Sequence, residues 1–482
     1  MIVPVIEGGD SLRIYVVQSG DTLWQISQVY GVPWNQIAQA NGLTDPNTLV
    51  VGQSLVIPPS ASIHIVRAGE TLWSIAQRYG VTIESLILSN QITNPSVIYV
   101  GQQLKLPTDF HTVQQGDSLW AISNQYGVSV QLIAYANRIQ NPSLIYPGQR
   151  LIIPGEQKVK IEVNAYSTFL NESGQQTVKE IGQYLTYITP FSYQLQQDGT
   201  VRSLQDDAFL RVSKEKGVAP LMVLTNFEEG EFSSELAHTV LNSANLQENL
   251  INNMLQILSQ KGYRGLNIDF EYLYPSDKEA YNEFLRNVVN RLRPLGYSVS
   301  TAIAPKYSRN QKGLLYEAHD YRAHGEIVDF VVIMTYEWGW SGGPPMAVAP
   351  LSEVKKVIQY ALTEMPKEKI MMGMPLYGYD WTLPYLEGGK WAKTLSPQQA
   401  VERAAQNGVA IQFDEKAQSP YYEYTDRDGK KHIVWFEDAR SVKAKYNLVE
   451  ELGLRGVSYW VLGNPFPQNW LVLHDQFNIQ NL

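Results

Sequence analysis

A repeated block of sequence constrains the first third of this chain more than any other feature. The block occurs three times, at residues 14–58, 63–107 and 110–154. Each copy opens with a short apolar stretch and a glycine–acid turn, continues through Tyr-Gly-Val, and closes with Gly-Gln, an apolar run and proline. The turn glycine and the closing glycine are 32 residues apart in every copy (52 − 20, 101 − 69 and 148 − 116). A constant internal length with variable linkers predicts one small folding unit used three times.

The periodicity within one copy predicts the order strand, helix, helix, strand. In the first copy, residues 15–17 and 55–57 are strand-like, and Pro58 ends the second run. Residues 23–30 place apolar side chains on one helical face behind Thr22 as the N-cap, and residues 34–41 predict a second short helix. A unit of about 45 residues is near the lower size limit for a domain without disulfides or metal. We expect the repeated tryptophans and tyrosines to pack mainly in the cores of these units.

The three blocks resemble LysM modules. The resemblance rests on Gly-Asp-Thr-Leu-Trp, Tyr-Gly-Val, an asparagine in the second helix and Val-Gly-Gln-x-Leu-x-Ile-Pro. It implies binding of N-acetylglucosamine polymers, peptidoglycan or chitin, in a shallow groove between the first turn and the loop before the last strand. The glycan contacts that it implies are the turn residues Gly20, Asp21, Thr22, Gly69, Glu70, Thr71, Gly116, Asp117 and Ser118, with the loops at 45–47, 94–96 and 141–143 as further candidates.

Composition narrows the classes of partner. The net charge of −9 disfavours nucleic acid or an anionic membrane as the main partner. Without cysteine, neither a disulfide framework nor a thiolate metal site can form, and the seven histidines are scattered without ligand spacing. No apolar run approaches the ~20 residues of a membrane span, and residues 1–12 do not resemble a secretion leader. We expect a monomer that uses no cofactor and no metal.

After residue 158, apolar strands alternate with helical stretches. The candidate strands are residues 159–166, 187–193, 218–225, 265–272, 299–304, 330–336, 370–376 and 456–461. Eight strands alternating with helices in about 300 residues predict an α/β fold, a (β/α)₈ TIM barrel at residues 158–482. The interval before the last strand is too long for one helix, so we expect an α+β insertion with a hairpin at about residues 384–445.

The fourth candidate strand carries the clearest chemical signal. Because alternate side chains of a strand share a face, Asn267, Asp269 and Glu271 are expected to point into the barrel, with Glu271 at its C-terminal mouth. Two carboxyl groups buried two residues apart are expected to share a proton, which raises the pKa of one and suits it to general acid catalysis. A lone Asp-x-Glu is usually part of a solvated face. Asn-x-Asp-x-Glu on an apolar strand is much more specific.

This strand and two later segments resemble glycoside hydrolase family 18, the chitinase-like retaining enzymes. Residues 263–272 are similar to the family's D-G-x-D-x-D-x-E signature, residues 334–337 to its M-x-Y-D, and residues 373–378 to its G-x-P-x-Y-G. Trp460 resembles the tryptophan that floors the sugar site. The resemblance covers nearly all of residues 158–482. In combination with LysM modules and no visible leader, it resembles bacterial spore-germination hydrolases, which degrade cortex peptidoglycan and are deposited on the developing spore from the mother cell.

The resemblance implies roles for named residues. In the family's substrate-assisted mechanism, Glu271 protonates the leaving glycosidic oxygen. Asp269 orients the substrate's 2-acetamido group, whose carbonyl attacks the anomeric carbon, and Tyr336 hydrogen-bonds that carbonyl. The substrate-binding residues implied are Asn267, Glu337, Trp460, Tyr377 and Met334, and Trp435 in the insertion is a further candidate for stacking on sugar.

The chain departs from the family pattern at three positions. Arg264 and Asn267 stand where the family has acids, and Glu337 stands where aspartate is usual. Because Asn267 removes one like charge below Asp269, Asp269 is expected to ionise more readily than in chitinases. The side chain of Glu337 is one methylene longer than aspartate, which changes its reach toward the acetamido group.

The leading hypothesis is a hydrolase of β-1,4-linked N-acetylhexosamine polymers, an N-acetylglucosaminidase of spore peptidoglycan. The alternative is a chitinase tethered by the same modules. A second alternative is a non-catalytic sugar-binding coat protein, which the intact Asp269 and Glu271 disfavour.

Overall fold

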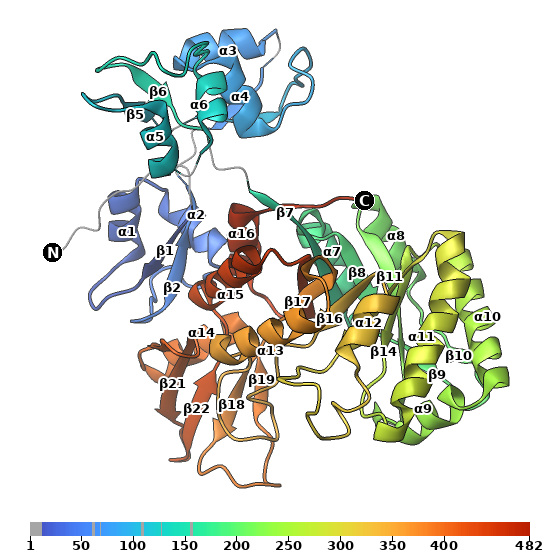
Figure 1. The fold of residues 1–482 in the computed structure, drawn as a ribbon. Coiled ribbons are helices and arrows are strands. Elements are labelled where there is room, and N and C mark those ends of the chain that lie inside the picture. The colour runs from blue at the N-terminus through green and yellow to red at the C-terminus, as the bar shows by residue number, and fades with distance from the viewer. Residues whose placement is uncertain (1–11, 60–62, 68, 108–109, 127, 155–157) are drawn as a thin grey trace. The chain divides into compact units, whose positions relative to one another are not determined.

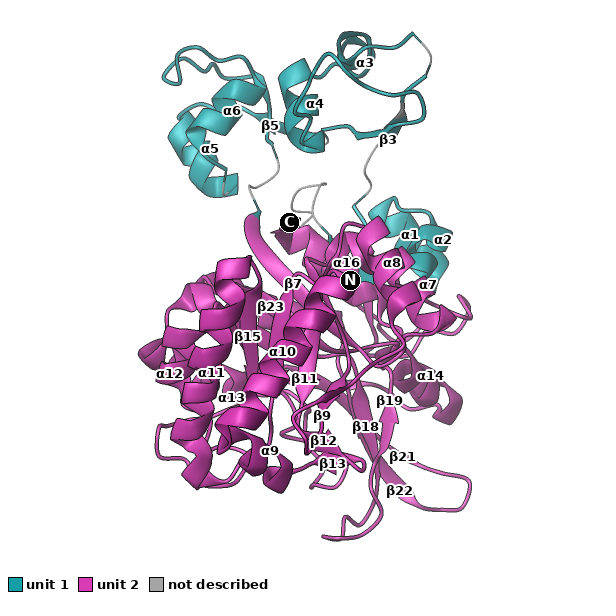
Figure 2. Cartoon of the chain, turned by 90° about the vertical axis from the view of Figure 1, so that its right-hand side faces the viewer, with its two compact units in different colours: residues 1–13, 22–40, 56–158 teal, residues 14–21, 41–55, 159–482 magenta. Residues whose placement is uncertain are grey.

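The computed structural model describes residues 12–59, 63–67, 69–107, 110–126, 128–154 and 158–482. Residues 1–11, on which the expectation about a secretion leader depends, and residues 60–62 and 108–109 between the repeated blocks lie outside these ranges. The chain separates into two compact units (Figure 2). One consists of residues 1–13, 22–40 and 56–158, and the other of residues 14–21, 41–55 and 159–482.

Each N-terminal block has the predicted βααβ order (Figure 1). The first contains β1 (Arg13–Val16), α1 (Leu23–Tyr30), α2 (Trp34–Ala40) and β2 (Ser54–Ile57). The second contains β3 (Ile63–Ile65), α3 (Leu72–Tyr79), α4 (Ile83–Asn90) and β4 (Gln103–Lys105). The third contains β5 (Phe110–Thr112), α5 (Leu119–Tyr126), α6 (Val130–Ala136) and β6 (Arg150–Ile152). In every block the two strands pair with each other.

Repeated polar residues explain why these small units fold. Thr22 caps α1 as predicted, in a capping box with Gln25. The repeated asparagine ties the second helix to the last strand: Asn90 Nδ2 donates to the carbonyl oxygen of Lys105 at 2.9 Å, and the Lys105 amide donates back to Asn90 Oδ1 at 2.7 Å. Asn137 makes the same pair of bonds with Ile152. These bonds supplement a core that is small for a domain.

The expectation that the repeated tryptophans lie in the cores is wrong. Trp24, Trp73 and Trp120 are 63%, 63% and 70% exposed. Each follows a buried leucine at the start of its helix, and successive helical residues point about 100° apart, so the tryptophan faces solvent. The cores are aliphatic instead, as in the second block, where Leu72, Ile75, Leu86 and Leu104 pack together.

The (β/α)₈ barrel is confirmed, with eight parallel strands closed into a ring. The strands, in ring order, are β7 (Val159–Ser167), β8 (Tyr187–Pro190), β11 (Ala219–Thr225), β14 (Gly265–Asp269), β15 (Ser298–Ile303), β16 (Phe330–Ile333), β17 (Ile370–Pro375) and β23 (Gly456–Leu462). Pairing of β23 with β7 closes the ring, with Val457 opposite Val163. Their buried, mostly aliphatic residues match strands covered on both faces.

Helices surround this ring (Figure 1). They are α7 (Glu172–Ile181), α8 (Asp207–Glu215), α9 (Ser234–Leu241), α10 (Ala244–Lys261), α11 (Lys278–Leu292), α12 (Tyr321–Ile327), α13 (Leu351–Glu364), α15 (Ala439–Leu452) and α16 (Pro467–Gln476). Short strands accompany the barrel, namely β9 (Tyr193–Leu195), β10 (Val201–Arg202), β12 (Phe227–Glu228), β13 (Glu231–Phe232) and β24 (Phe477–Ile479). The fourth barrel strand ends at Asp269 rather than at Tyr272, because Tyr272 turns the chain in the left-handed region with φ of 54°.

The α+β insertion is a five-stranded antiparallel sheet with one helix. Its strands have the order β19 (Lys393–Leu395), β18 (Gly378–Thr382), β22 (Lys431–Trp435), β21 (Ser419–Thr425) and β20 (Gln412–Asp414), and α14 (Pro397–Asn407) packs against it. The sheet thus starts at Gly378, directly after the seventh barrel strand. The predicted hairpin is β21–β22, in which Tyr422 pairs with Val434.

Candidate active site

A cavity of about 810 Å³ opens at the C-terminal ends of the barrel strands. Its polar lining comes from residues at or just past the ends of four strands, namely Tyr166, Asp269, Glu271, Tyr336, Glu337 and Trp460. Met334 also lines it. The cavity therefore brings together Asp269, Glu271, Tyr336, Glu337, Met334 and Trp460 from the predicted set, at the end of the barrel where enzymes of this fold place their chemistry.

Two side chains, those of Asn226 and Ser234, fix the backbone that carries Glu271. The Asn226 side chain accepts a hydrogen bond from the Glu271 amide at 3.0 Å and donates to the Glu271 carbonyl oxygen at 2.9 Å. Ser234 Oγ donates to the carbonyl oxygen of Tyr272, the residue with positive φ. A strained backbone position held by surrounding bonds is typical of functional sites. The direction in which Glu271 projects is thus set by neighbouring loops as well as by β14.

A buried histidine holds the peptide just before Glu271. His319 Nδ1 accepts from the Ala304 amide at 3.0 Å, so the proton lies on Nε2, which donates to the Phe270 carbonyl oxygen at 2.9 Å. Burial lowers the pKa of His319 to about 4, which keeps the ring neutral and preserves this arrangement at neutral pH. His319 therefore connects the segment that carries Glu271 to the end of the fifth barrel strand without carrying charge.

Burial governs the two central carboxyl groups. Asp269 is 4% exposed, and its Oδ1 has no hydrogen-bond partner among the described residues. Desolvation raises the pKa of Asp269 to about 7. Desolvation also raises the pKa of Glu271 well above its usual value, and the negative charges of Asp269 and Glu337 raise it further. Near neutral pH the pair can hold one proton on Glu271, the arrangement that a general acid needs.

Asn267 lies below the cavity rather than in its lining. Its Oδ1 accepts from the Tyr166 hydroxyl at 2.8 Å, and its Nδ2 donates to Ser300 Oγ at 2.9 Å. These neutral bonds fill the place where the family pattern has an acid. Burial still raises the pKa of Asp269 above that of an ordinary aspartate.

Glu337 projects into the cavity from a second left-handed position, with φ of 69°. Its Oε1 accepts hydrogen bonds from two tyrosine hydroxyls, that of Tyr377 and, at 2.9 Å, that of Tyr379. Loss of water around the carboxyl group raises the pKa of Glu337, and the two hydroxyl bonds oppose that rise. Tyr377 thus contacts Glu337 and is absent from the cavity wall, so its predicted sugar contact would run through Glu337.

Tyr336 depends on a glycine of the neighbouring strand. A Cβ at Gly373 would lie 2.9 Å from Cε1 of the Tyr336 ring and 2.6 Å from the carbonyl oxygen of Ile333. Gly373 therefore provides the space for that ring. Burial raises the pKa of Tyr336 well above its usual value, as do the nearby Tyr166, Asp269 and Glu271. The Tyr336 hydroxyl therefore keeps its proton and remains a hydrogen-bond donor at neutral pH.

The aromatic candidates separate into two groups. Trp460 lines the cavity and packs on Phe191, with ring centroids 4.8 Å apart, and on Tyr166 at 5.7 Å. Trp435 does not line it and instead stacks on Tyr421, with centroids 4.6 Å apart. The position of Trp435 in the small sheet thus separates it from the cavity in this structure.

The prediction from sequence missed part of the cavity wall. The additional lining residues with aromatic rings are Tyr166, Phe191, Phe227, Phe232, Tyr272 and Tyr316. Tyr166 and Tyr272 end predicted strands, and their position at the strand ends was the sequence signal that could have placed them in the cavity wall. Asn226 and His319 had no comparable signal, because a single polar residue in a loop does not reveal which backbone it will contact.

The turn residues of the three blocks have structural bonds. The Asp21 carboxylate accepts from the Tyr15 hydroxyl at 2.6 Å, and Glu70 contacts His64 Nε2 at 2.6 Å. Asp117 contacts His111 Nε2 at 2.8 Å. Thr22 and Thr71 cap helices, the Ala121 amide donates to Ser118 Oγ, and Gly20, Gly69 and Gly116 have positive φ. Their glycan contacts stay a prediction, and the exposed tryptophans beside them are added as candidates.

The described residues offer neither a candidate metal site nor a membrane-spanning helix. They contain no group of three or more histidine, aspartate or glutamate side chains arranged to hold a metal ion. No helix in this part of the chain has the length and apolar character needed to cross a membrane.

Comparison with known proteins gives matches for both parts of the chain. The model of the glycosyl hydrolases family 18 matches residues 162–464, and the LysM domain model matches residues 15–58, 64–107 and 111–154. The cortical fragment-lytic enzyme of Bacillus subtilis (strain 168) is 49% identical over 472 residues, covering 97% of this chain and 99% of that protein. The crystal structure of the spore cortex-lytic enzyme SleL of Bacillus megaterium QM B1551 matches with a TM-score of 0.77 at 40% identity, covering 98% of this chain and 100% of that one. The corresponding Bacillus cereus structure gives a TM-score of 0.76 at 39% identity, covering 98% and 99%.

Proposed function

This chain belongs to the family 18 glycosyl hydrolases and carries three LysM domains, and from that premise we propose that it hydrolyses β-1,4 N-acetylhexosamine linkages of spore cortex peptidoglycan. The observation that carries the proposal is the buried pair Asp269 and Glu271 at the barrel mouth, in a chain that aligns over nearly its whole length with a cortical fragment-lytic enzyme. The activity is that of a retaining glycosidase, and we propose that its bond preference is that of an N-acetylglucosaminidase.

The residues of the cavity would divide the first chemical step between them. The carbonyl oxygen of the substrate's 2-acetamido group attacks the anomeric carbon, and the bond from that carbon to the glycosidic oxygen breaks. Glu271 transfers its proton to the departing oxygen. Asp269, as a carboxylate, accepts the acetamido N–H and stabilises the positive charge of the oxazolinium. The Tyr336 hydroxyl donates to the attacking carbonyl group and holds it below the sugar ring.

The second step restores the enzyme. The Glu271 carboxylate removes a proton from water, and the resulting hydroxide attacks the anomeric carbon from the face that the leaving group vacated. The oxazolinium ring opens, the acetamido group re-forms, and the configuration at the anomeric carbon is retained. The raised pKa of Glu271 supports both roles, because such a carboxyl group keeps a transferable proton at a higher pH than an ordinary glutamate and recovers it more readily.

The substrate and location follow from both halves of the chain. LysM and family 18 domains indicate binding of an N-acetylglucosamine polymer of the peptidoglycan or chitin type. Two solved structures quoted above are of spore cortex-lytic enzymes, and we propose that this protein is likewise associated with the spore.

Digestion of purified cortex fragments beside chitin oligomers tests the proposal. Mass spectrometry of the products identifies the sugar at each new reducing end. We expect N-acetylglucosamine there, and faster release from cortex fragments than from chitin oligomers of equal length. Preferred cleavage of chitin oligomers would support the tethered chitinase instead, and no cleavage of either substrate would contradict the catalytic assignment.

A further inference from the structure

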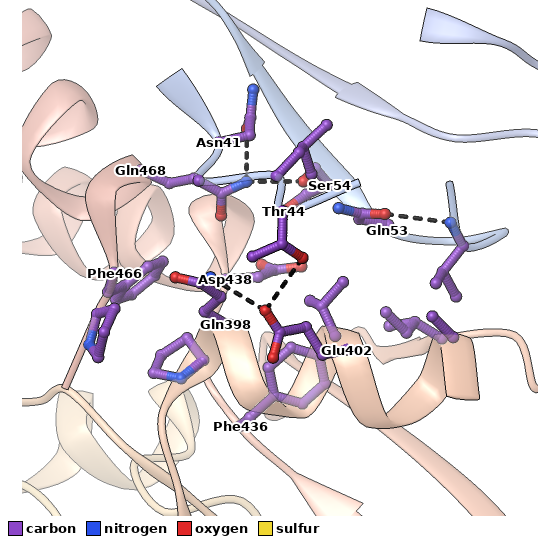
Figure 3. A pocket seen from close by; sticks show the side chains of 18 of the residues that line it. Asn41, Thr44, Gln53, Ser54, Gln398, Glu402, Phe436, Asp438, Phe466 and Gln468 are labelled. Carbon is purple, nitrogen blue, oxygen red and sulfur yellow. Dashed lines mark hydrogen bonds between the residues drawn. The ribbon is translucent and has the colours of Figure 1, made fainter. Parts of the chain in front are cut away.

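A second cavity, of about 530 Å³, lies in the barrel-containing unit away from the active site (Figure 3). One wall is the segment 41–54 of the first LysM module, and the other is formed by α14, residues 436–438 and residues 465–468. It shares no lining residue with the active-site cavity. Its volume is within the range of about 300–1,000 Å³ that is usual for small-ligand sites.

The walls of this cavity are fixed by direct bonds. Gln468 Nε2 donates to Asn41 Oδ1 at 2.6 Å and to the Ser54 carbonyl oxygen at 2.8 Å (Figure 3). The Ile411 amide donates to the Val51 carbonyl oxygen at 2.9 Å. Val50 is buried in the apolar cluster that also contains Ile411. The cavity is therefore a built feature with two joined walls and does not depend on a mobile loop.

Two buried oxygens in the cavity lining lack hydrogen-bond partners among the described residues, Ser54 Oγ and Glu437 Oε1. Ser54 is 3% exposed and Glu437 is 1% exposed. The other carboxyl oxygen of Glu437 accepts from Lys445 Nζ at 2.8 Å and from Ser441 Oγ at 2.6 Å. Buried polar atoms are nearly always paired, so two unpaired oxygens on residues that line one cavity leave acceptors that the donors of a bound ligand would satisfy.

The charge of the lining defines the class of that ligand. Among the described residues, no lysine or arginine lines the cavity, whereas Asp45, Glu402, Glu437 and Asp438 do. Arg440 is next to it but is held by Asp438 and by the Gly52 carbonyl oxygen. An anionic ligand such as a phosphate or a free lactyl carboxylate would thus lack a counter-charge.

The remaining lining suits an uncharged sugar. Amide and hydroxyl groups of Gln398, Gln53 and Thr44 lie around an apolar surface that includes Phe436 and Val401. Sugar hydroxyls and acetamido N–H groups are donors for carboxylate and carbonyl oxygens, and the ring faces pack on apolar side chains. A mostly apolar cavity with a few converging polar groups is the usual design of a specific site.

This site shares the loop before the last strand, including Asp45, with the groove that the LysM resemblance implies, but it does not include the first turn of that groove. None of the turn residues Gly20, Asp21 and Thr22 lines it. The second and third modules have exposed tyrosines, Tyr99 and Tyr146, two residues before the closing glycine, whereas the first module has the buried Val50 there. The first module thus departs from its sister modules at the segment that forms the cavity wall.

We propose that this cavity is a second glycan-binding site, shared by the first LysM module and the catalytic domain, which takes an uncharged N-acetylhexosamine oligosaccharide. The proposal rests on the proposed function for its substrate class. Ser54 Oγ and Glu437 Oε1 accept hydrogen bonds from the sugar, and the apolar surface packs on its ring. Binding here holds a stretch of polymer on the same compact unit as the active site.

Photolabelling tests the site directly. The probe is tri-N-acetylchitotriose bearing a diazirine, added to the full chain with Glu271→Gln so that it is not cleaved. We expect saturable labelling of peptides that contain residues 397–406 and 436–441, in addition to labelling of the active site and the modules. Absence of saturable labelling in those peptides would overturn the proposal, and so would displacement of the probe there by a free peptide and not by unlabelled sugar.

Three variants separate binding from folding. Ala405→Trp fills the cavity from α14 and should abolish labelling there, whereas Asn407→Trp, on the same helix and outside the cavity lining, should not. Ser54→Ala should weaken the labelling affinity about three- to tenfold, the loss of one hydrogen bond. Because Ser54 Oγ has no partner among the described residues, this variant should not lower the melting temperature. Undiminished labelling in both Ala405→Trp and Ser54→Ala would overturn the proposal.

Hydrolysis measured separately keeps this inference apart from the proposed function. With Glu271 restored, Ser54→Ala should retain the kcat of the unaltered chain on a short soluble cortex fragment. Labelling at the cavity without hydrolysis of any cortex substrate would contradict the proposed function and support the site. Hydrolysis of cortex substrate without labelling at the cavity would support the proposed function and contradict the second site.

Discussion

Glu271 lies just past the end of β14, where Asn226 fixes its backbone and the cavity surrounds its carboxyl group. Replacing Glu271 with glutamine preserves the shape of the side chain and removes the transferable proton. We expect kcat on cortex fragments to fall about 10²–10⁴-fold, the usual contribution of a general acid, with little change in oligosaccharide affinity. Steady-state kinetics and binding of a non-hydrolysed oligosaccharide measure the two effects.

Glu231→Gln is the matched control, because Glu231 is an exposed glutamate on β13 that does not line the cavity. It should leave kcat within about twofold of the unaltered chain, as expected for a group outside the reaction. Retention of most activity by Glu271→Gln, or an equal loss in both variants, would contradict the assignment of the acid.

The pH profile of kcat/KM reports the same carboxyl groups. The active form has Asp269 ionised and Glu271 protonated, so activity should rise as pH passes the pKa of Asp269, about 7, and fall at higher pH as Glu271 ionises. The charge of Glu337 raises the pKa of Glu271. Glu337→Gln removes that charge, so Glu271 should ionise at lower pH and the alkaline limb should move to lower pH.

The acid limb should stay where it is in Glu337→Gln, because burial alone raises the pKa of Asp269. Profiles of kcat/KM for both proteins from pH 5 upward, on one soluble substrate, make the comparison. A shift of the alkaline limb to higher pH would show that Glu337 does not act on Glu271 through its charge.

At the residue scale, the sequence indicated the groups to which we assign the chemistry better than the groups that hold them. Asp269 and Glu271 were predictable because alternating polar side chains on an apolar strand are costly and therefore informative. Asn226 and His319 fix the same segment through backbone atoms. Which loop meets which backbone depends on the closed barrel, and that information is not local to either residue.

At the scale of elements, the segment 41–55 is part of the barrel-containing unit and contacts the α+β insertion. A Cβ at Gly52 would lie 1.8 Å from the Ile411 carbonyl oxygen, and Gly52 has φ of 83°. We expect Gly52→Ala to destabilise this contact by about 2–3 kcal/mol, since both clash and backbone strain oppose it. Hydrogen exchange of the Ile411 amide, which donates to Val51, should accelerate accordingly.

Gly31→Ala provides the control for backbone strain without a clash. Gly31 has φ of 65° at the end of α1, and a Cβ there meets nothing within 4 Å. Gly31→Ala should lower the free energy of unfolding by about 1 kcal/mol and leave the hydrogen exchange of the Ile411 amide unchanged. Equal exchange rates at Ile411 in Gly52→Ala and the unaltered chain would show that the close approach at Gly52 does not hold the two segments together.

The elements show where periodicity succeeds and where it fails. All eight barrel strands lie within the predicted ranges or extend one residue beyond them, because continuous apolar runs are diagnostic when helices separate them. The three copies of equal length indicate independent modules, yet residues 41–55 are assigned to the compact unit of the barrel. The sequence sign of this difference was Val50, an apolar residue where the sister modules have tyrosine. That sign could be interpreted only once the position of α14 was known.

At the scale of the whole molecule, the protein combines one catalytic cavity with several places that can hold polymer. The exposed tryptophans of the second and third modules, Trp73 and Trp120, are candidates for stacking on sugar rings. Linking weak sites raises avidity about 10²–10⁴-fold without a new contact at the active site. Replacing both tryptophans with alanine should therefore lower retention on insoluble peptidoglycan by at least about tenfold, while kcat on a short soluble fragment stays unchanged.

Sedimentation with insoluble peptidoglycan and steady-state kinetics on the soluble fragment measure the two halves of this prediction. The matched control replaces Val100 and Leu144, which are 71% and 53% exposed in the same modules, with alanine. All four side chains are largely in solvent, so neither pair of changes should lower stability by more than about 0.5 kcal/mol per residue. If both double variants sediment like the unaltered chain, the tryptophans do not bind the polymer. If the tryptophan variant instead loses turnover on the soluble fragment while it remains folded, the modules take part in catalysis, and the division of the chain into a binding part and a catalytic part would be wrong.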